Sequence, residues 1–179
     1  PWFRDNARKL PWRETREPYP VWVSEIMLQQ TRVEAVLGYY RRLLAAFPTV
    51  EDLARAPEEQ LLKLWEGLGY YSRARNLQKA ARRVAEELDG RFPDSFEGLL
   101  ALPGVGEYTA GAVASICFDR PCAAVDGNVL RVLSRFLADD SPRETMKKWA
   151  KPALEAVYPP GQCGMFTQAL MELGATVCV

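Results

Sequence analysis

Apolar residues recur at helical spacing along nearly the whole chain, and this pattern constrains the fold more than any other feature of the 179 residues. Proline and glycine interrupt the pattern at short intervals, as expected where helices begin and end. We therefore predict an all-α protein with little room for strands. The helices are expected at 20–30, 32–46, 50–55, 58–66, 71–88, 95–100, 108–118, 128–137, 142–157 and 163–173.

Local signals support several of these boundaries. Thr49 and Asp52 are spaced like a capping box before the helix at 50–55, and Gly90 follows a helix end. The sequence has no internal repeat and no Ser/Gly-rich linker, so composition alone marks no domain boundary.

The residue content excludes several classes of function. The chain has no histidine, which excludes Ser-His-Asp and Cys-His catalytic groups and histidine-bound zinc. Lys and Arg together number 23, as do Asp and Glu, so bulk charge attracts no polyanion. The longest apolar run, 110–118, is too short to span a membrane. The four cysteines form no CxxC pair, which favours a reducing intracellular compartment.

One stretch departs from this even charge. Between positions 73 and 83, directly after the loop GLGYYS, the chain has no acid and carries the basic residues Arg73, Arg75, Lys79, Arg82 and Arg83. Such a run is usually a solvated helix face. The alternative is a helix that follows phosphates while a neighbouring aromatic residue contacts bases.

A glycine-containing turn separates two apolar helices within LPGVGEYTAGAVASI, at 102–116. Pro103, Gly104 and Gly106 predict a tight turn that leaves backbone N–H groups uncovered at the start of the second helix. Together with the positive end of the helix dipole, these amides form a phosphate site that needs no net positive charge. The alternative is an ordinary corner between two helices.

Two carboxyl groups stand in contrasting contexts. Glu25 is the only ionisable residue within 21–28, so burial should raise its pKa and suit it as a general acid. Alternatively, it lies at the rim of its helix with the carboxylate in water. Asp126 precedes an apolar helix, where a carboxylate caps the helix and stays ionised. An ionised carboxylate beside a protonated one is the pairing that glycosidic cleavage requires.

Five motifs, in this order, closely resemble the adenine DNA glycosylases of the MutY type: VSEIMLQQT, EGLGYYSRARNL, LPGVGEYTAGA, VDGN and ALMELGATVC. That family belongs to the helix-hairpin-helix superfamily, which also contains endonuclease III. The resemblance implies a two-lobed all-α fold, with a six-helix barrel at 20–125 and a second lobe from 1–19 and 126–179. Duplex DNA would be held between the lobes with the target adenine flipped out.

The resemblance also implies catalytic roles. Glu25 would protonate adenine N7, and Asp126 would stabilise the oxocarbenium-like sugar. Tyr108 and Asn128 would orient these carboxylates. Tyr108 stands where the bifunctional lyases of the superfamily have a lysine, which disfavours Schiff-base chemistry.

Binding roles follow from the same resemblance. The implied DNA contacts are wedge residues Gln30 and Tyr70, Thr31 and Leu68 near the opposing base, and Gly104, Val105 and Gly106 on a phosphate. The adenine pocket is implied to include Trp12, Arg13 and Glu172.

The family also carries a four-iron four-sulfur cluster, held by cysteines in the pattern C-x6-C-x2-C-x5-C. Cys178 matches the first ligand, and the remaining three ligands do not occur in this sequence. Because Cys117, Cys122 and Cys163 do not fit the spacing, we expect that this chain alone cannot complete the cluster. The chain looks C-terminally truncated relative to the family and lacks the domain that reads 8-oxoguanine.

The sequence thus predicts a monofunctional DNA N-glycosylase that hydrolyses the N-glycosidic bond of adenine mispaired with 8-oxoguanine or guanine, in base-excision repair. Its partner would be double-stranded DNA with an adenine mismatch. We expect a monomer without a membrane partner, associated with DNA in the bacterial cytoplasm or nucleoid. The alternatives are a DNA-binding fragment without catalysis and an endonuclease III-like glycosylase/lyase.

Overall fold

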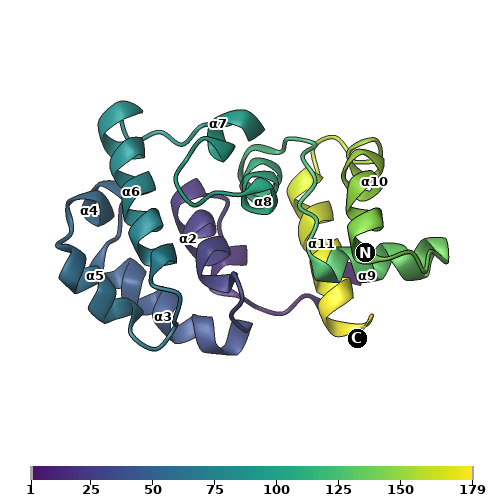
Figure 1. Cartoon of the computed structure of the whole chain (residues 1–179), viewed down its shortest axis with the longest axis horizontal. Coiled ribbons are helices and arrows are strands. Elements are labelled where there is room, and N and C mark those ends of the chain that lie inside the picture. Colours follow the sequence, from purple (N-terminus) through teal and green to yellow (C-terminus); the bar gives the residue numbers. More distant parts are fainter. Residues whose placement is uncertain (1, 179) are drawn as a thin grey trace. The chain divides into compact units, whose positions relative to one another are not determined.

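The computed structural model describes residues 2–178, and this part of the chain consists of helices and loops without a strand (Figure 1). The predicted all-α class is confirmed. A 3-10 helix, η1, covers Pro11–Arg13. The α-helices are α1 (Trp2–Asn6), α2 (Pro18–Leu28), α3 (Val33–Ala46), α4 (Val50–Arg55), α5 (Glu58–Trp65), α6 (Ser72–Glu87), α7 (Phe96–Leu100), α8 (Glu107–Phe118), α9 (Gly127–Leu137), α10 (Arg143–Glu155) and α11 (Cys163–Thr176). Within residues 2–178, no helix is both long and apolar enough to cross a membrane.

The predicted helices agree with these bounds to within three residues at each end. The capping box before α4 is confirmed, because Thr49 Oγ1 accepts from Asp52 N at 3.2 Å and Asp52 Oδ2 accepts from Thr49 N at 3.1 Å. The sequence did not predict α1 and η1. With five and three residues, these elements are too short to display helical periodicity.

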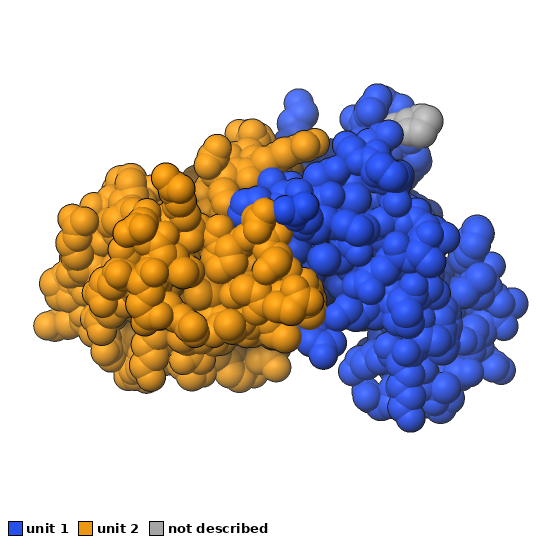
Figure 2. Space-filling model, turned by 90° about the horizontal axis from the view of Figure 1, so that it is seen from above, with its two compact units in different colours: residues 1–10, 107–179 blue, residues 11–106 orange. Residues whose placement is uncertain are grey.

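The chain divides into two compact units, coloured separately in Figure 2. Unit 2 is the continuous segment Pro11–Gly106, and unit 1 combines residues 1–10 with 107–179. Segments from both halves of the sequence, 2–10 and 107–178, therefore belong to one unit. The six-helix barrel expected at 20–125 and the second lobe expected from 1–19 and 126–179 stay a prediction.

Unit 2 is organised around α2, which contacts η1, α3 and α6, while α4 and α5 pack against α6. Every residue of α2 from Val21 to Met27 is buried, as expected for a helix that is apolar on all sides. Trp22 contributes one of the largest buried side chains and makes an edge-to-face contact with Phe92, with ring centroids 5.3 Å apart. The core of unit 2 thus surrounds the helix that carries Glu25.

Unit 1 is organised around α11, which packs against α1, α8 and α9, while α10 packs against α9. Two glycines bring α11 close to its neighbours. A Cβ at Gly164 would lie 2.7 Å from Cα of Ile116 in α8, and a Cβ at Gly174 would lie 2.4 Å from the carbonyl oxygen of Asn128 in α9. The start of α9 is therefore held directly against the last turns of α11.

Candidate functional site

Asp126 caps α9 and holds its carboxylate through two hydrogen bonds. Oδ1 accepts from the amide of Val129 at 2.8 Å, and Oδ2 accepts from Nδ2 of Asn128 at 2.8 Å. The positive end of the helix dipole adds to the stabilisation of a negative charge at this place. The predicted capping role of Asp126 is confirmed, and the carboxylate has one fixed orientation.

Arg131 extends this arrangement along the same face of α9. Its Nη2 donates to Oδ1 of Asn128 at 2.8 Å and to the carbonyl oxygen of Gly174 at 2.6 Å, and its Nε donates to the carbonyl oxygen of Cys178. Arg131 thus orients the Asn128 amide toward Asp126 and ties α9 to the end of α11. Sequence reasoning missed Arg131, although its position three residues after Asn128 places both on one helix face.

Tyr108 is the second residue of α8, also in unit 1. Its hydroxyl donates to Sδ of Met171 on α11 at 3.6 Å. Tyr108, Asp126 and Asn128 therefore share one unit, and Asp126 and Asn128 are in direct contact. The orienting role assigned to Tyr108 stays a prediction.

Glu25 lies in the middle of α2, in unit 2, and is only 5% exposed. Its neighbours along the helix, from Val21 to Met27, are buried as well. The apolar surroundings predicted for this carboxyl are therefore present, and the alternative of a carboxylate at a wet helix rim is wrong. Glu25 is thus buried within a helix whose neighbouring residues are buried, while the carboxylate of Asp126 accepts hydrogen bonds at the start of α9.

The basic run after the GLGYYS loop is neither a uniform solvated face nor a row of free cations. Arg73 is buried, with 8% exposure, and donates to backbone carbonyls within unit 2. Burial lowers the pKa of Arg73 from its ordinary value, and the nearby Tyr70 acts in the opposite direction. Arg75 is exposed and pairs with Glu58 at 2.9 Å, while Arg83 donates to the carbonyl oxygen of Ala101 at 2.7 Å.

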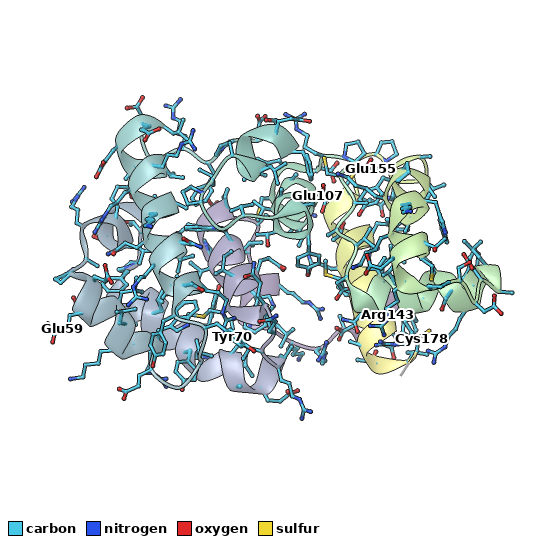
Figure 3. The ribbon with its side chains drawn as sticks, in the orientation of Figure 1. Glu59, Tyr70, Glu107, Arg143, Glu155 and Cys178 are labelled. Carbon is cyan, nitrogen blue, oxygen red and sulfur yellow. The ribbon has the colours of Figure 1, made fainter. Side chains whose placement is uncertain are left out.

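The expected wedge residues share an uncommon backbone conformation. Gln30 has a φ of 57° and Tyr70 a φ of 48°, in the left-handed region that residues other than glycine rarely adopt. Both side chains are exposed, and Tyr70, labelled in Figure 3, is 62% exposed. Thr31 and Leu68 lie beside them in sequence, and the side chain of Leu68 is buried.

The predicted tight turn at 102–106 is present. Gly104 has a φ of 75°, and the amide of Val105 donates to the carbonyl oxygen of Leu102 at 3.1 Å. A Cβ at Gly104 would lie 2.7 Å from Cβ of Asn76, whereas a Cβ at Gly106 would meet no atom within 4 Å. Gly104 is therefore required by the fold, while Gly106 leaves open space beside the backbone.

The three residues expected around the adenine belong to different units. Trp12 is buried in unit 2 and makes an edge-to-face contact with Tyr40, with centroids 5.2 Å apart, and Arg13 follows it in η1. Glu172 belongs to unit 1 and is fully buried. Its Oε1 accepts from N and Nε of Arg8, and its Oε2 accepts from Nη2 at 2.8 Å. Glu172 thus fastens the N-terminal segment to α11, a role that the sequence did not reveal.

The cysteines do not provide a cluster site. Cys178 follows the end of α11 (Figure 3), and within residues 2–178 no three Cys, Asp or Glu side chains gather as metal ligands. Cysteine thiolates hold a four-iron four-sulfur cluster, and no such group of thiolates is gathered within residues 2–178.

Comparisons with known proteins agree with this geometry. The family described as HhH-GPD superfamily base excision DNA repair protein matches residues 23–154. Over 99% of its length, the chain is 50% identical to the adenine DNA glycosylase of Mus musculus, 48% identical to that of Homo sapiens and 39% identical to that of Buchnera aphidicola subsp. Baizongia pistaciae. It spans only 36%, 34% and 51% of these relatives.

Solved structures show the same fold. A thermostable thymine-DNA glycosylase matches with a TM-score of 0.90 and 31% identity, over 99% of this chain and 83% of that one. A trapped endonuclease III–DNA covalent intermediate matches with a TM-score of 0.80 and 28% identity, over 99% of this chain and 81% of that one. The chain therefore belongs to the HhH-GPD superfamily of base excision DNA repair proteins.

Proposed function

We propose that this protein is a monofunctional DNA N-glycosylase that removes adenine mispaired with 8-oxoguanine or guanine. The observation that carries the proposal is the contrast between its two carboxyl groups. Glu25 is buried among apolar residues of α2, while both oxygens of Asp126 accept hydrogen bonds at the start of α9. A buried carboxyl and a carboxylate held by hydrogen-bond donors are suited to different roles in glycosidic cleavage.

In this mechanism, the C1′–N9 bond breaks and its electron pair leaves with the base. Glu25 donates a proton to N7, so that adenine departs neutral. The carboxylate of Asp126 stabilises the positive charge that develops on the sugar. Water then adds to C1′ and releases a proton. Asn128 holds Asp126 through their hydrogen bond, and Tyr108 would help to orient the carboxyl groups of Glu25 and Asp126.

Tyr108 argues against the endonuclease III-like lyase alternative. A lyase needs an amine that attacks the sugar as a nucleophile, and at this position the chain offers a phenol whose hydroxyl donates to Met171. Hydrolysis without a covalent amine adduct is therefore the proposed reaction.

The proposed partner is double-stranded DNA with an adenine mismatch, bound by a monomer that is associated with DNA in the cell. Two of the matching solved structures are endonuclease III–DNA complexes, which supports DNA as the partner of this protein. Gln30 and Tyr70 would enter the duplex, Thr31 and Leu68 would lie near the opposing base, and the turn at 104–106 would hold a phosphate through its amides. Trp12, Arg13 and Glu172 would line the adenine pocket.

Adenine release under single-turnover conditions tests the assigned acid. Glu25→Gln keeps the shape of the side chain but removes the proton, so release should fall by at least about 100-fold. Glu59→Gln on α5 is the matched control, because Glu59 is exposed (Figure 3). A Glu25→Gln variant with the release rate of the control would refute the mechanism.

The alternative of a DNA-binding fragment without catalysis predicts a different result in the same assay. Under that alternative, the protein retards mismatch duplexes on a gel but releases no adenine.

A further inference from the structure

The buried guanidinium of Arg73 forms hydrogen bonds to residues beside both expected wedge residues, Gln30 and Tyr70. Arg73 Nη1 donates to the carbonyl oxygen of Gln29, directly before Gln30, and Nη2 donates to Thr31 Oγ1 at 3.2 Å, directly after it. The same Nη1 donates to the carbonyl oxygen of Met27 at 2.9 Å. Arg73 thus forms hydrogen bonds to the residues on both sides of Gln30, just after the end of α2.

The other wedge residue is held by the same arginine. Nη2 donates to the carbonyl oxygens of Leu68 at 3.1 Å and Gly69 at 3.3 Å, directly before Tyr70. The backbone amide of Arg73 donates to the carbonyl oxygen of Tyr70 at 2.9 Å. The guanidinium carbon also lies 5.5 Å from the centre of the Tyr70 ring, within the range of a cation–π contact.

The buried guanidinium of Arg73 is not expected to add much to the stability of the fold. No carboxylate is among the hydrogen-bond partners of Arg73 in residues 2–178, and its buried Nε has no partner there. A buried charge without a counter-charge is costly and gives little net stability. Its fixed fork of donors instead defines the positions of the carbonyls that it binds.

The held segments need such support. Residues other than glycine pay a conformational cost in the left-handed region, and they persist there only where the surroundings impose it. Gln30 and Tyr70 both adopt that conformation although they are exposed. Arg73 bonds to residues next to both of them.

We propose that Arg73 is a positioning residue that locks Gln30 and Tyr70 into a rigid pair able to unstack a base pair, so that wedge insertion depends on its guanidinium. The inference rests on the proposed function only in taking these two residues as the wedges. Arg73 itself touches no DNA in this proposal.

The test measures base unstacking separately from catalysis. A duplex carries 2-aminopurine beside the target adenosine, whose 2′-fluorine slows cleavage, and fluorescence rises when the base unstacks. Arg73→Met should reduce this rise by roughly tenfold, because a displacement of about 1 Å at a positioned group has effects of up to about 100-fold. Arg75→Met is the matched control, because it removes one positive charge from the exposed side of α6.

A second comparison separates positioning from folding. Glycine adopts the left-handed region without strain, so the double variant Gln30→Gly/Tyr70→Gly needs no clamp and carries no wedge. Adding Arg73→Met to that background should change neither unstacking nor release further. A merely structural role would produce the same fold-loss in both backgrounds and overturn the proposal.

Other results of these experiments would separate a failure of folding, of the proposed function and of the positioning role of Arg73. Arg73→Lys keeps the charge but cannot bridge both segments, and it should show the same loss if Arg73→Met does not fold. Failure of both variants to fold would assign Arg73 to stability and overturn the proposal, as would wild-type protein that unstacks no base. If the wild-type protein unstacks the base but releases no adenine, only the proposed function fails. If it releases adenine while Arg73→Met matches Arg75→Met, only this inference fails.

Discussion

Gly174 leaves no room for a side chain, and Gly174→Ala tests the packing that supports Asp126. The added Cβ would lie 2.4 Å from the carbonyl oxygen of Asn128 and 2.7 Å from its Cβ. Ordinary contact between such atoms is about 3.5 Å, so the start of α9 or the end of α11 must move by about 1 Å.

The expected change in the free energy of unfolding combines two opposing effects. Overpacking costs about 1–3 kcal/mol, and the better helix propensity of alanine offsets about 1 kcal/mol of this. We expect a net loss of up to about 2 kcal/mol in the free energy of unfolding, measured in urea. Because the displaced residue is Asn128, which donates to Asp126, adenine release should also fall by roughly tenfold.

Gly38→Ala in α3 is the control with the opposite sign. Its Cβ would meet only the flexible end of Arg42, at 3.3 Å from Nη1. The substitution should therefore raise the free energy of unfolding by about 0.5–1 kcal/mol and leave adenine release unchanged. A Gly174→Ala variant as stable and as active as Gly38→Ala would refute the packing argument.

Three further substitutions probe contacts in unit 1. Arg131→Met removes the donor to Asn128, so adenine release should fall by about tenfold; unchanged release would show that Asn128 needs no support. Glu172→Gln leaves the cation of Arg8 without its buried carboxylate, which should lower the free energy of unfolding by about 2–3 kcal/mol, less than for a fully buried pair because Arg8 is partly exposed. Burial raises the pKa of Tyr158 from 10.0 to about 12, so its contribution to stability is complete below pH 10 and is lost as pH rises to 12, by up to about 2.7 kcal/mol. Tyr158→Phe should therefore be the less stable protein at pH 7, by about 1 kcal/mol, but not at pH 12, and a constant difference across this range would contradict the assigned cause.

Local sequence signals predicted the helices well because the forces behind them are local. The periodic apolar residues of α3 and α6 and the capping box at Thr49 depend on neighbours within a few positions. The short elements α1 and η1 escaped prediction because they lack a full period. The division at 10–11 and 106–107 follows tertiary packing, which composition does not record.

The candidate site shows the same limit. Asp126 was predicted as a cap because its partner, the Val129 amide, is three residues away. The partners of Arg73 lie up to 47 residues away, and Glu172 meets Arg8 across 164 residues. Nothing in a charge run tells a buried arginine from an exposed one, so Arg73 and Arg75 could not be distinguished from the sequence.

Adenine release from matched duplexes tests whether this protein is an adenine glycosylase that uses Glu25 as its acid. One duplex pairs the adenine with 8-oxoguanine and the other pairs it with thymine, and both are followed under single-turnover conditions with Glu25→Gln and Glu59→Gln beside the wild-type protein. We expect release from the 8-oxoguanine duplex alone, by the wild-type protein and Glu59→Gln but not by Glu25→Gln. Equal release from both duplexes, or undiminished release by Glu25→Gln, would contradict it.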